Sequence, residues 1–220
     1  MKKYAIIVAG GKGRRMESEV PKQFLQLLDK PILMHTIEKF QTFSREIEIV
    51  LVLPEQFIGL WKSLIDPYNF SVVHQVVKGG ECRFESVKNG LQVIPTNGLV
   101  AIHDGVRPLV SIETLEKVYS SSEKLGNAIP VIPVNESLRS VGKQGSSPVD
   151  RTQYKIVQTP QCFHSDIIKK AYEQEFKEEY TDDAMVAEAM GIKINLVEGN
   201  SENIKITRLS DILFAESLLA

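Results

Sequence analysis

Positively charged side chains near the N-terminus follow two glycines that come directly after an apolar run. The run Ala5–Ala9 leads into Gly10 and Gly11, and the cations Arg15 and Lys22 follow a short distance on. Glycine lets the backbone approach phosphate oxygens closely, and successive N–H groups in such a turn form an anion-binding concavity. Arginine and lysine supply the charge that glycine lacks. The segment therefore predicts a site for the phosphates of a nucleotide.

Two common phosphate-binding loops do not fit this turn. A Walker A loop needs Gly-x-x-x-x-Gly-Lys-Ser/Thr, which the chain lacks. In a dinucleotide fingerprint, Met16 would occupy the position of the third glycine, which normally lets a helix pack closely on a strand. A structural turn with solvated basic residues remains the alternative at this point.

The bulk properties exclude several classes of protein. The chain has 220 residues and a formal net charge of −2, so it is long enough for a sizeable core and lacks the basic excess of a nucleic-acid binder. No apolar run reaches the length of a membrane span, and the first strand begins near Tyr4, so we expect neither a membrane anchor nor a signal peptide. Cys82 and Cys162 form no Cys-x-x-Cys motif and are expected to be unlinked thiols of a cytoplasmic protein.

Apolar strand-like segments alternate with helix-like segments, which predicts an α/β fold with a mostly parallel, Rossmann-like sheet flanked by helices. The predicted strands are Ala5–Val8, Ile47–Leu53, Val72–Val77, Leu99–His103 and Ala128–Val131. The predicted helices are Ile32–Phe40, Glu81–Leu91, Ser111–Lys124, Ser165–Glu179, Asp182–Met190 and Leu209–Leu219. Thr181 is expected at the N-cap of the fifth of these helices, where exposed backbone N–H groups favour an anion.

Residues 133–157 interrupt this alternation. Two short alternating runs flank the Gly/Ser/Pro-rich stretch Gly142–Pro148, which is typical of a β-hairpin. A hairpin has little core of its own, so we expect it to pack against something else, such as another subunit. The predicted organisation is one domain spanning residues 1–220, with this hairpin as an inserted arm for dimerisation.

Motifs along the whole chain resemble those of known nucleotidyltransferases. The segments Gly10–Met16 and Pro21–Phe24 are similar to the signature of enzymes that join a nucleoside triphosphate to a sugar or alditol phosphate. Further blocks match the cytidylyltransferase branch in order and at similar spacing: Gly79–Val87, His103–Pro108, Val149–Arg151, Gln158–Phe163, Thr181–Ala184 and Asn203–Thr207. The resemblance is strongest to the 2-C-methyl-D-erythritol 4-phosphate cytidylyltransferase family of non-mevalonate isoprenoid synthesis.

This resemblance implies a reaction and a set of roles. A phosphate of 2-C-methyl-D-erythritol 4-phosphate would attack the α-phosphorus of CTP, with Mg²⁺ or another divalent cation present and pyrophosphate leaving. The implied catalytic residues are Arg15, Lys22, Arg151 and Lys205. The implied nucleotide-binding residues are Ala9, Gly10, Gly11, Gly80, Glu81 and Ser86, with Glu81 in place of the more usual aspartate.

The resemblance also assigns the acceptor side of the site. The implied acceptor-binding residues are Asp104, Arg107, Ser137, Arg151, Thr181 and Lys205, with Ser137 in place of a threonine. Asp104 is the single candidate metal ligand, and Arg107 is expected either to clamp a phosphate or to pair with Asp104. Because the family's arm reaches into the neighbouring subunit, the resemblance implies a homodimer with a shared active site.

Two alternatives remain open from the sequence. The acceptor could be ribitol 5-phosphate, although the block Val149–Arg151 favours the erythritol branch. The chain could also be a non-catalytic nucleotide-binding module. The retention of Arg15, Lys22, Arg151 and Lys205 argues against that second alternative.

Overall fold

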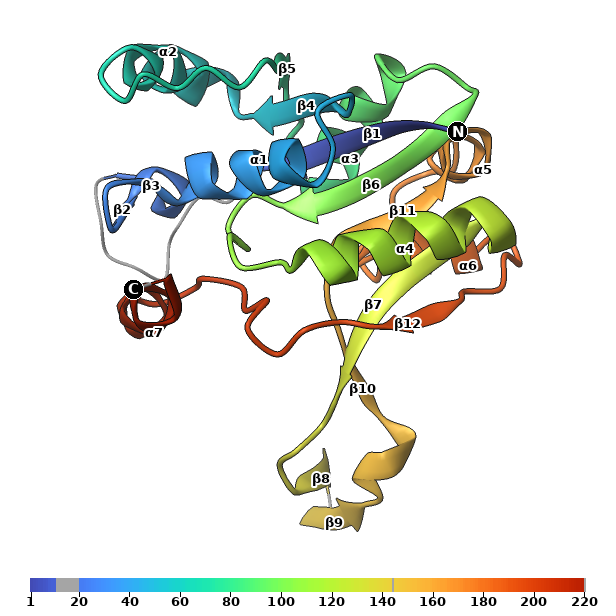
Figure 1. The fold of residues 1–220 in the computed structure, drawn as a ribbon. Coiled ribbons are helices and arrows are strands. Elements are labelled where there is room, and N and C mark those ends of the chain that lie inside the picture. Colours follow the sequence, from blue (N-terminus) through green and yellow to red (C-terminus); the bar gives the residue numbers. More distant parts are fainter. Residues whose placement is uncertain (11–19, 144, 220) are drawn as a thin grey trace.

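The computed structural model describes residues 1–10, 20–143 and 145–219. Within these ranges, eight strands form one sheet in the order β10-β7-β11-β6-β1-β4-β5, and β12 also pairs with β7 (Figure 1). The strands are β1 Lys2–Val8, β4 Glu48–Leu53, β5 Gln75–Lys78, β6 Gly98–Asp104, β7 Asn127–Pro133, β10 Lys155–Val157, β11 Gln161–His164 and β12 Leu196–Glu198.

The centre of the sheet is parallel. Strand β1 pairs in parallel with β4 on one side and with β6 on the other, so that Ile6 lies between Val50 and Ile102. Strand β4 pairs in parallel with β5 on its other side. Every residue of β6 is buried, because helices cover both faces of the sheet there. Only β10 and β11 run antiparallel to their neighbours in the described sheet. The predicted α/β class with a mostly parallel sheet is confirmed.

The described helices are α1 Ile32–Phe43, α2 Glu55–Ile65, α3 Arg83–Gln92, α4 Ile112–Leu125, α5 Ser165–Ala171, α6 Asp183–Glu188 and α7 Leu209–Leu219. All but α7 form two layers, one on each face of the sheet, whereas the buried side chains of α7 belong to a separate cluster. Alternate residues of β1 belong to different cores: Ile7 packs with side chains of α1, α2 and α4, whereas Ile6 packs with side chains of α3, α5 and α6. Figure 1 shows α1 and α4 in front of the sheet and α3 behind it.

Helix ends follow the local chemistry of the chain. The Ser111 hydroxyl oxygen accepts a hydrogen bond from the Thr114 N–H at the start of α4, and Gly126 ends that helix with a left-handed φ of 88°. The predicted helix Ser165–Glu179 is too long, since α5 ends at Ala171. Beyond it, the Gln174 amide donates to the Ala171 carbonyl oxygen and the charged residues that follow offer no apolar face to bury.

Several elements were not predicted. The short strands β10, β11 and β12 have too few residues to show an apolar period. The helix α2 was not predicted although Phe57, Trp61 and Leu64 recur at helical spacing. The predicted strand Val72–Val77 pairs with β4 only from Gln75 onward. In the described ranges, none of the helices combines the length and the apolar character that crossing a membrane would require.

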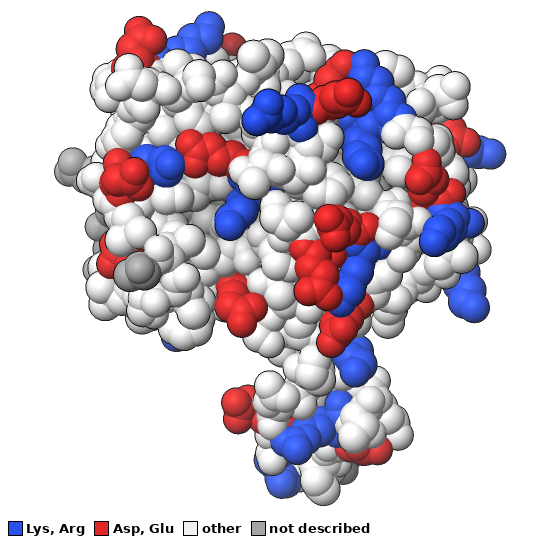
Figure 2. Space-filling model, viewed as in Figure 1, with Lys and Arg blue, Asp and Glu red and all other residues white. Residues whose placement is uncertain are grey.

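The hairpin predicted within residues 133–157 is present. Strands β8 Leu138–Gly142 and β9 Gly145–Val149 pair antiparallel and form a two-stranded sheet of their own. Figures 1 and 2 show this arm extending away from the main sheet as a separate lobe. On the face drawn in Figure 2, Lys and Arg lie among Asp and Glu, in line with the net charge of −2.

Short elements complete the described fold. The 3-10 helix η1 spans Lys22–Phe24, and η2 spans Arg151–Gln153 between β9 and β10. Strands β2 Gln26–Leu27 and β3 Lys30–Pro31 form a small hairpin. This hairpin lies against α7, because the buried Leu27 packs with Ile212 and Ala215 of that helix.

Candidate active site

Three loops meet at the carboxyl ends of the parallel strands. The Ala9 N–H donates to the Val52 carbonyl oxygen at 3.0 Å, which ties the end of β1 to the end of β4. The Gly105 N–H donates to the Val8 carbonyl oxygen at 2.9 Å, which ties the loop after β6 to β1. Open α/β sheets bind ligands at this edge. The sequence motifs that follow these strands therefore lie next to one another.

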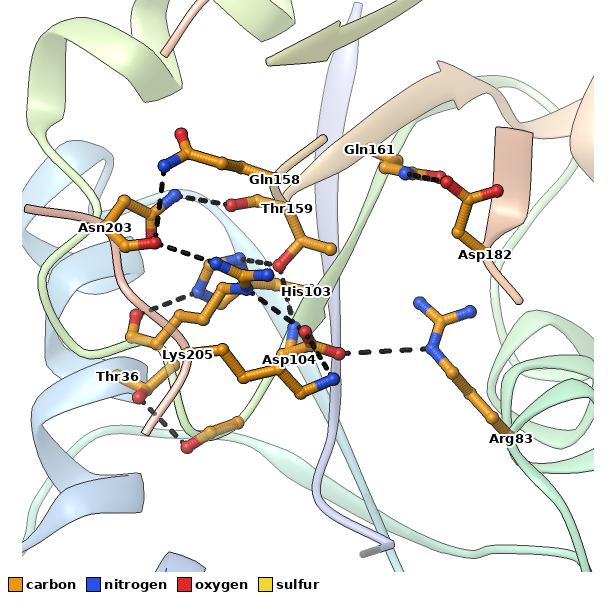
Figure 3. Close-up of polar contacts among 12 residues, drawn as sticks. Thr36, Arg83, His103, Asp104, Gln158, Thr159, Gln161, Asp182, Asn203 and Lys205 are labelled. Carbon is orange, nitrogen blue, oxygen red and sulfur yellow. Dashed lines mark hydrogen bonds and ion pairs between the residues drawn. The ribbon is translucent and has the colours of Figure 1, made fainter. Parts of the chain in front are cut away.

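Asp104, the last residue of β6, is surrounded by cations from three parts of the chain. Its Oδ2 lies 3.1 Å from Arg107 Nε and 3.1 Å from Lys205 Nζ, and its Oδ1 lies 3.9 Å from Arg83 Nε. Figure 3 shows Arg83 and Lys205 directed toward Asp104 from opposite sides. We call these four residues the Asp104 cluster. Of the two roles expected for Arg107, the observed one is pairing with Asp104.

The charge of the cluster favours an anion. Burial by itself would raise the pKa of Asp104, but Lys205, Arg83 and Arg107 outweigh it and hold that pKa well below its ordinary value. Asp104 is therefore ionised at neutral pH. Three cations stand against two carboxylates, Asp104 and the buried Asp183, which leaves one positive charge in excess. Such an excess in a partly buried site suits a phosphate group.

Arg83 is a member of the cluster that sequence reasoning did not assign. Its guanidinium donates to both carboxylate oxygens of Asp183, at 2.8 and 2.7 Å, and the Tyr172 hydroxyl donates to Asp183 Oδ1 at 2.6 Å. Burial opposes the charge of Arg83, yet Asp183 and then Asp104 raise its pKa above the ordinary value. The position of Arg83 within the motif Gly79–Val87 was the sequence signal that could have predicted a role in the site. Its pairing with Asp183 could not be predicted, because only the fold brings α3 and α6 together.

The segment that carries Lys205 is anchored on both sides of that residue. The Asn203 side-chain amide donates to the Thr159 carbonyl oxygen at 2.8 Å, and Arg107 Nη1 donates to the Asn203 carbonyl oxygen at 2.8 Å. The Ile206 N–H donates to the Val106 carbonyl oxygen at 2.9 Å. Because the backbone is fixed at Asn203 and at Ile206, Lys205 is positioned with its ammonium group at Asp104, although its side chain is 43% exposed.

His103, directly before Asp104, is completely buried. Its Nε2 lies 3.0 Å from the Arg107 carbonyl oxygen and its Nδ1 lies 3.0 Å from the Thr159 hydroxyl oxygen. Burial is the largest influence on the ring and lowers the pKa of His103 to about 4, so the imidazole is neutral at pH 7. It is not a cation of the site.

The nucleotide side of the predicted site gathers around Ser86. The Ser86 hydroxyl donates to the Cys82 carbonyl oxygen at 2.9 Å and accepts from the Gly80 N–H at 3.2 Å. A Cβ added at Gly79 would lie 2.9 Å from Ser86 Oγ, and one added at Gly10 would lie 3.7 Å from it. The turn after β1 and the loop before α3 therefore meet at this hydroxyl.

Other predicted residues of this side lie close by. Glu81 is exposed, and its N–H donates to Glu85 Oε2 at 2.6 Å. Lys22 begins η1, whose next residue, Gln23, donates from its amide to the Ala9 carbonyl oxygen at 2.8 Å. Since Gln23 is buried and bonded at the end of β1, Lys22 is placed beside the first turn. Gly11 and Arg15 lie outside the described residues.

The expected N-cap role of Thr181 is wrong. Asp182 is the N-cap of α6, and its Oδ1 accepts a hydrogen bond from the Met185 N–H at 3.0 Å. Gln161 donates from its amide to the other carboxylate oxygen, which holds Asp182 in place. The hydroxyl of the exposed Thr181 donates instead to the sulfur of Met185. A carboxylate oriented by Gln161 is the better acceptor here.

Ser137 and Arg151 lie on the arm. Both residues are exposed, and Arg151 Nη1 donates to the Asn135 carbonyl oxygen within the arm itself. Because the arm extends away from the sheet, a single chain does not bring these two residues to the Asp104 cluster (Figure 1).

An open, mostly parallel sheet with a glycine turn and a cation-rich cluster at its strand ends defines the class of protein, a nucleotidyltransferase. The family model described as "IspD: 2-C-methyl-D-erythritol 4-phosphate cytidylyltransferase" matches residues 4–220. The chain belongs to this family and is a cytidylyltransferase.

Relatives of the same description match the chain over its length. A 2-C-methyl-D-erythritol 4-phosphate cytidylyltransferase of Bacteroides thetaiotaomicron is 51% identical over 219 residues, which cover 100% of each chain. One from Porphyromonas gingivalis is 48% identical and covers 99% of this chain and 98% of its own.

Solved structures share the fold. The 4-diphosphocytidyl-2C-methyl-D-erythritol synthase of Anaerococcus prevotii has a TM-score of 0.84 at 28% identity, covering 99% of this chain and 96% of its own. The bifunctional IspDF of Campylobacter jejuni has a TM-score of 0.81 at 28% identity, covering 96% of this chain and 53% of its own.

Proposed function

We propose that this chain transfers the cytidylyl group of CTP to 2-C-methyl-D-erythritol 4-phosphate, with the Asp104 cluster and the adjoining glycine turns as its active site. One observation carries the site assignment: Arg83, Arg107 and Lys205, from three separate segments, converge on one buried carboxylate at the carboxyl ends of parallel strands. Membership of the cytidylyltransferase family supports the choice of substrates.

In the proposed reaction, a phosphate oxygen of the acceptor forms a bond to the α-phosphorus of CTP. The bond from that phosphorus to the oxygen bridging to the β-phosphate breaks, and pyrophosphate leaves with the electron pair. The protein's work is to align two anions that repel each other and to stabilise the charge that develops between them. Lys205 lies near the acceptor phosphate, and Asp104 orients the cations around it.

The remaining assignments follow the motifs. Arg15 and Lys22 stabilise charge on the CTP phosphates, while backbone groups of Ala9, Gly10 and Gly11 approach them. The loop at Gly80 and Glu81, braced by Ser86, reads the cytosine. Residues for the acceptor are Asp104, Arg107, Ser137, Arg151, Thr181 and Lys205.

A divalent cation such as Mg²⁺ fits this site only as a partner of the substrate phosphates. In the part of the chain that the structure describes, no three His, Cys, Asp or Glu side chains are grouped so as to hold a metal. Asp104 is the candidate protein ligand for the metal, through its Oδ1. Arg83 Nε lies 3.9 Å from this oxygen. Magnesium commonly binds through phosphates and water with one or two carboxylates. It would neutralise phosphate charge.

Replacing Arg15 or Lys22 by alanine should lower kcat by about a hundredfold or more, the scale on which a single preorganised charge stabiliser acts. The measurement is pyrophosphate release with CTP, Mg²⁺ and 2-C-methyl-D-erythritol 4-phosphate. Near-normal turnover in both variants would refute their assigned roles.

The same assay tests the acceptor. The wild-type chain should release pyrophosphate rapidly with 2-C-methyl-D-erythritol 4-phosphate and slowly with ribitol 5-phosphate. Faster release with ribitol 5-phosphate would overturn the acceptor assignment. CTP binding without pyrophosphate from either acceptor would instead indicate a non-catalytic module.

The arm supports a further part of this proposal, a homodimer in which Ser137 and Arg151 complete the partner's site. Residues 133–157 form the dimerisation arm of a single domain spanning residues 1–220. The exposed side chains Val141, Tyr154 and Ile156 on the arm offer apolar area for such contact.

We place the enzyme in the cytoplasm, where its free thiols Cys82 and Cys162 would stay reduced.

A shared site predicts complementation between two inactive variants. R151A and K205A should each be impaired, but a refolded equimolar mixture should regain about a quarter of wild-type activity. Half of the dimers would then be mixed, and each mixed dimer holds one intact site and one doubly altered site. Activity equal to the mean of the two parent variants would show that Arg151 and Lys205 act in the same chain.

A further inference from the structure

The turn Asp104–Arg107 carries two charged members of the Asp104 cluster, and its backbone is bonded at nearly every polar group. The Arg107 N–H donates to the Asp104 carbonyl oxygen at 3.1 Å, which closes the turn. The Gly105 carbonyl oxygen accepts from the Thr36 hydroxyl at 3.1 Å. The Val106 carbonyl oxygen accepts from the Ile206 N–H. These bonds tie the turn to α1 and to the segment that carries Lys205.

His103 serves the two ends of this turn. The Arg107 carbonyl oxygen can only accept, so His103 Nε2, 3.0 Å away, must carry the proton that is donated to it. The Thr159 hydroxyl oxygen accepts the Asp104 N–H at 3.1 Å and lies 3.0 Å from His103 Nδ1. The hydroxyl therefore donates its own proton to Nδ1. One neutral ring thus holds the backbone of Asp104 through Thr159 and the backbone of Arg107 directly.

The ring itself has no freedom to move. His103 is completely buried, and its ring packs edge-on against Phe40 of α1 with 5.1 Å between the ring centroids. Its backbone is part of β6, paired with Ile7 of β1. Figure 3 shows it on the side of Asp104 away from Arg83. The side chain is therefore placed to brace the turn and not to touch a substrate.

We infer that His103 is a positioning residue for the transfer reaction, which fixes the Asp104–Arg107 turn so that Asp104 and Arg107 hold their charges in the geometry the reacting phosphates require. This inference rests on the proposed active site. The contacts attributed to CTP lie in other segments, so the loss of His103 should lower kcat far more than it raises the KM for CTP. A displacement of about 1 Å at such groups costs on the order of a hundredfold in rate.

The first test removes the two ring nitrogens of His103. H103F keeps an aromatic ring that can pack on Phe40 but makes neither hydrogen bond, and it should lower kcat at least about tenfold. H103Q retains one donor and one acceptor in a similar volume and should recover a large part of that loss.

His74 provides a matched control. Like His103, this part-buried histidine has both ring nitrogens bonded, to Trp61 Nε1 and to the Val72 carbonyl oxygen, and it lies next to β5 outside the proposed site. H74F should reduce thermal stability much as H103F does while leaving kcat within about twofold of wild type. Equal losses of kcat in H74F and H103F would mean that a general loss of stability explains both.

A second test examines the link through Thr159. If His103 acts through this hydroxyl, T159V should lower kcat, and H103F/T159V should be hardly worse than H103F alone. A long-range ¹H–¹⁵N spectrum of the wild type should show the Nε2–H tautomer of His103. The Nδ1–H tautomer, or strictly additive effects of the two substitutions, would overturn the inference.

The outcomes separate this inference from the proposed site. If K22A and K205A remain active, the site assignment fails whatever His103 does. If both are impaired while H103F keeps kcat within about twofold of wild type, the site stands and the positioning role of His103 is refuted.

Discussion

Replacing Lys205 by alanine should lower kcat by about a hundredfold or more, with a smaller change in the KM for CTP. Lys205 Nζ lies 3.1 Å from Asp104, and the bonds of Asn203 and Ile206 fix the backbone on both sides of it. An ammonium group held in advance stabilises developing phosphate charge without the cost of reorganising at the moment of reaction. Steady-state pyrophosphate release, with each substrate varied in turn, measures both constants.

Two variants give this experiment its controls. K205R restores the charge but not the compact ammonium group, so it should recover only part of the lost rate. K62A removes an exposed lysine on α2 and should leave kcat unchanged. A K205A enzyme with kcat within about twofold of wild type would remove Lys205 from the catalytic groups.

D183N should lower the free energy of unfolding by about 3 kcal/mol, because it leaves a largely buried guanidinium without its principal carboxylate. Asp183 is completely buried and accepts hydrogen bonds from Arg83 and from the Tyr172 hydroxyl. The substitution keeps the size of the side chain, removes its charge and replaces one of its two acceptor oxygens by an NH2 group that cannot accept a hydrogen bond. Arg83 then retains only the more distant Asp104, at 3.9 Å, as an acidic partner among the contacts described above.

Urea denaturation followed by circular dichroism measures this effect as a lower midpoint at an unchanged m-value. E188Q is the matched control, since Glu188 is exposed on the same helix, and it should change the free energy of unfolding by no more than about 0.5 kcal/mol. If D183N unfolds at the wild-type midpoint, the Arg83–Asp183 pair does not hold α3 against α6.

Much of the fold was predictable because its signals are local. Strand β1 and its neighbours are short, apolar and rich in β-branched residues, and they form the parallel centre of the sheet as expected. Pro31, Ser111 and Gly126 mark helix ends through their own backbone and side-chain chemistry. Strands β10–β12 were missed because each has only three or four residues and pairing with distant strands holds them in place. The helix α2 could have been predicted, since Phe57, Trp61 and Leu64 lie at helical spacing on one face.

The candidate site was predictable only in part. The motifs named Asp104, Arg107 and Lys205, and the structure brings these three together. Arg83 was missed because its place in the cluster depends on α6, which begins about a hundred residues later in the chain. The misplaced N-cap has a similar cause, since Asp182 is oriented by Gln161 from a different strand.

The chemical parts of the site follow from the order of residues alone: glycines that expose backbone N–H groups, cations of suitable kinds, and strands that leave these motifs at one edge of a sheet. Which charges meet depends on the folded arrangement, because these ion pairs form where distant segments converge. The folded arrangement also set the arm apart from the Asp104 cluster and gave His103 both of its hydrogen-bond partners, since each of these outcomes depends on the packing of distant segments.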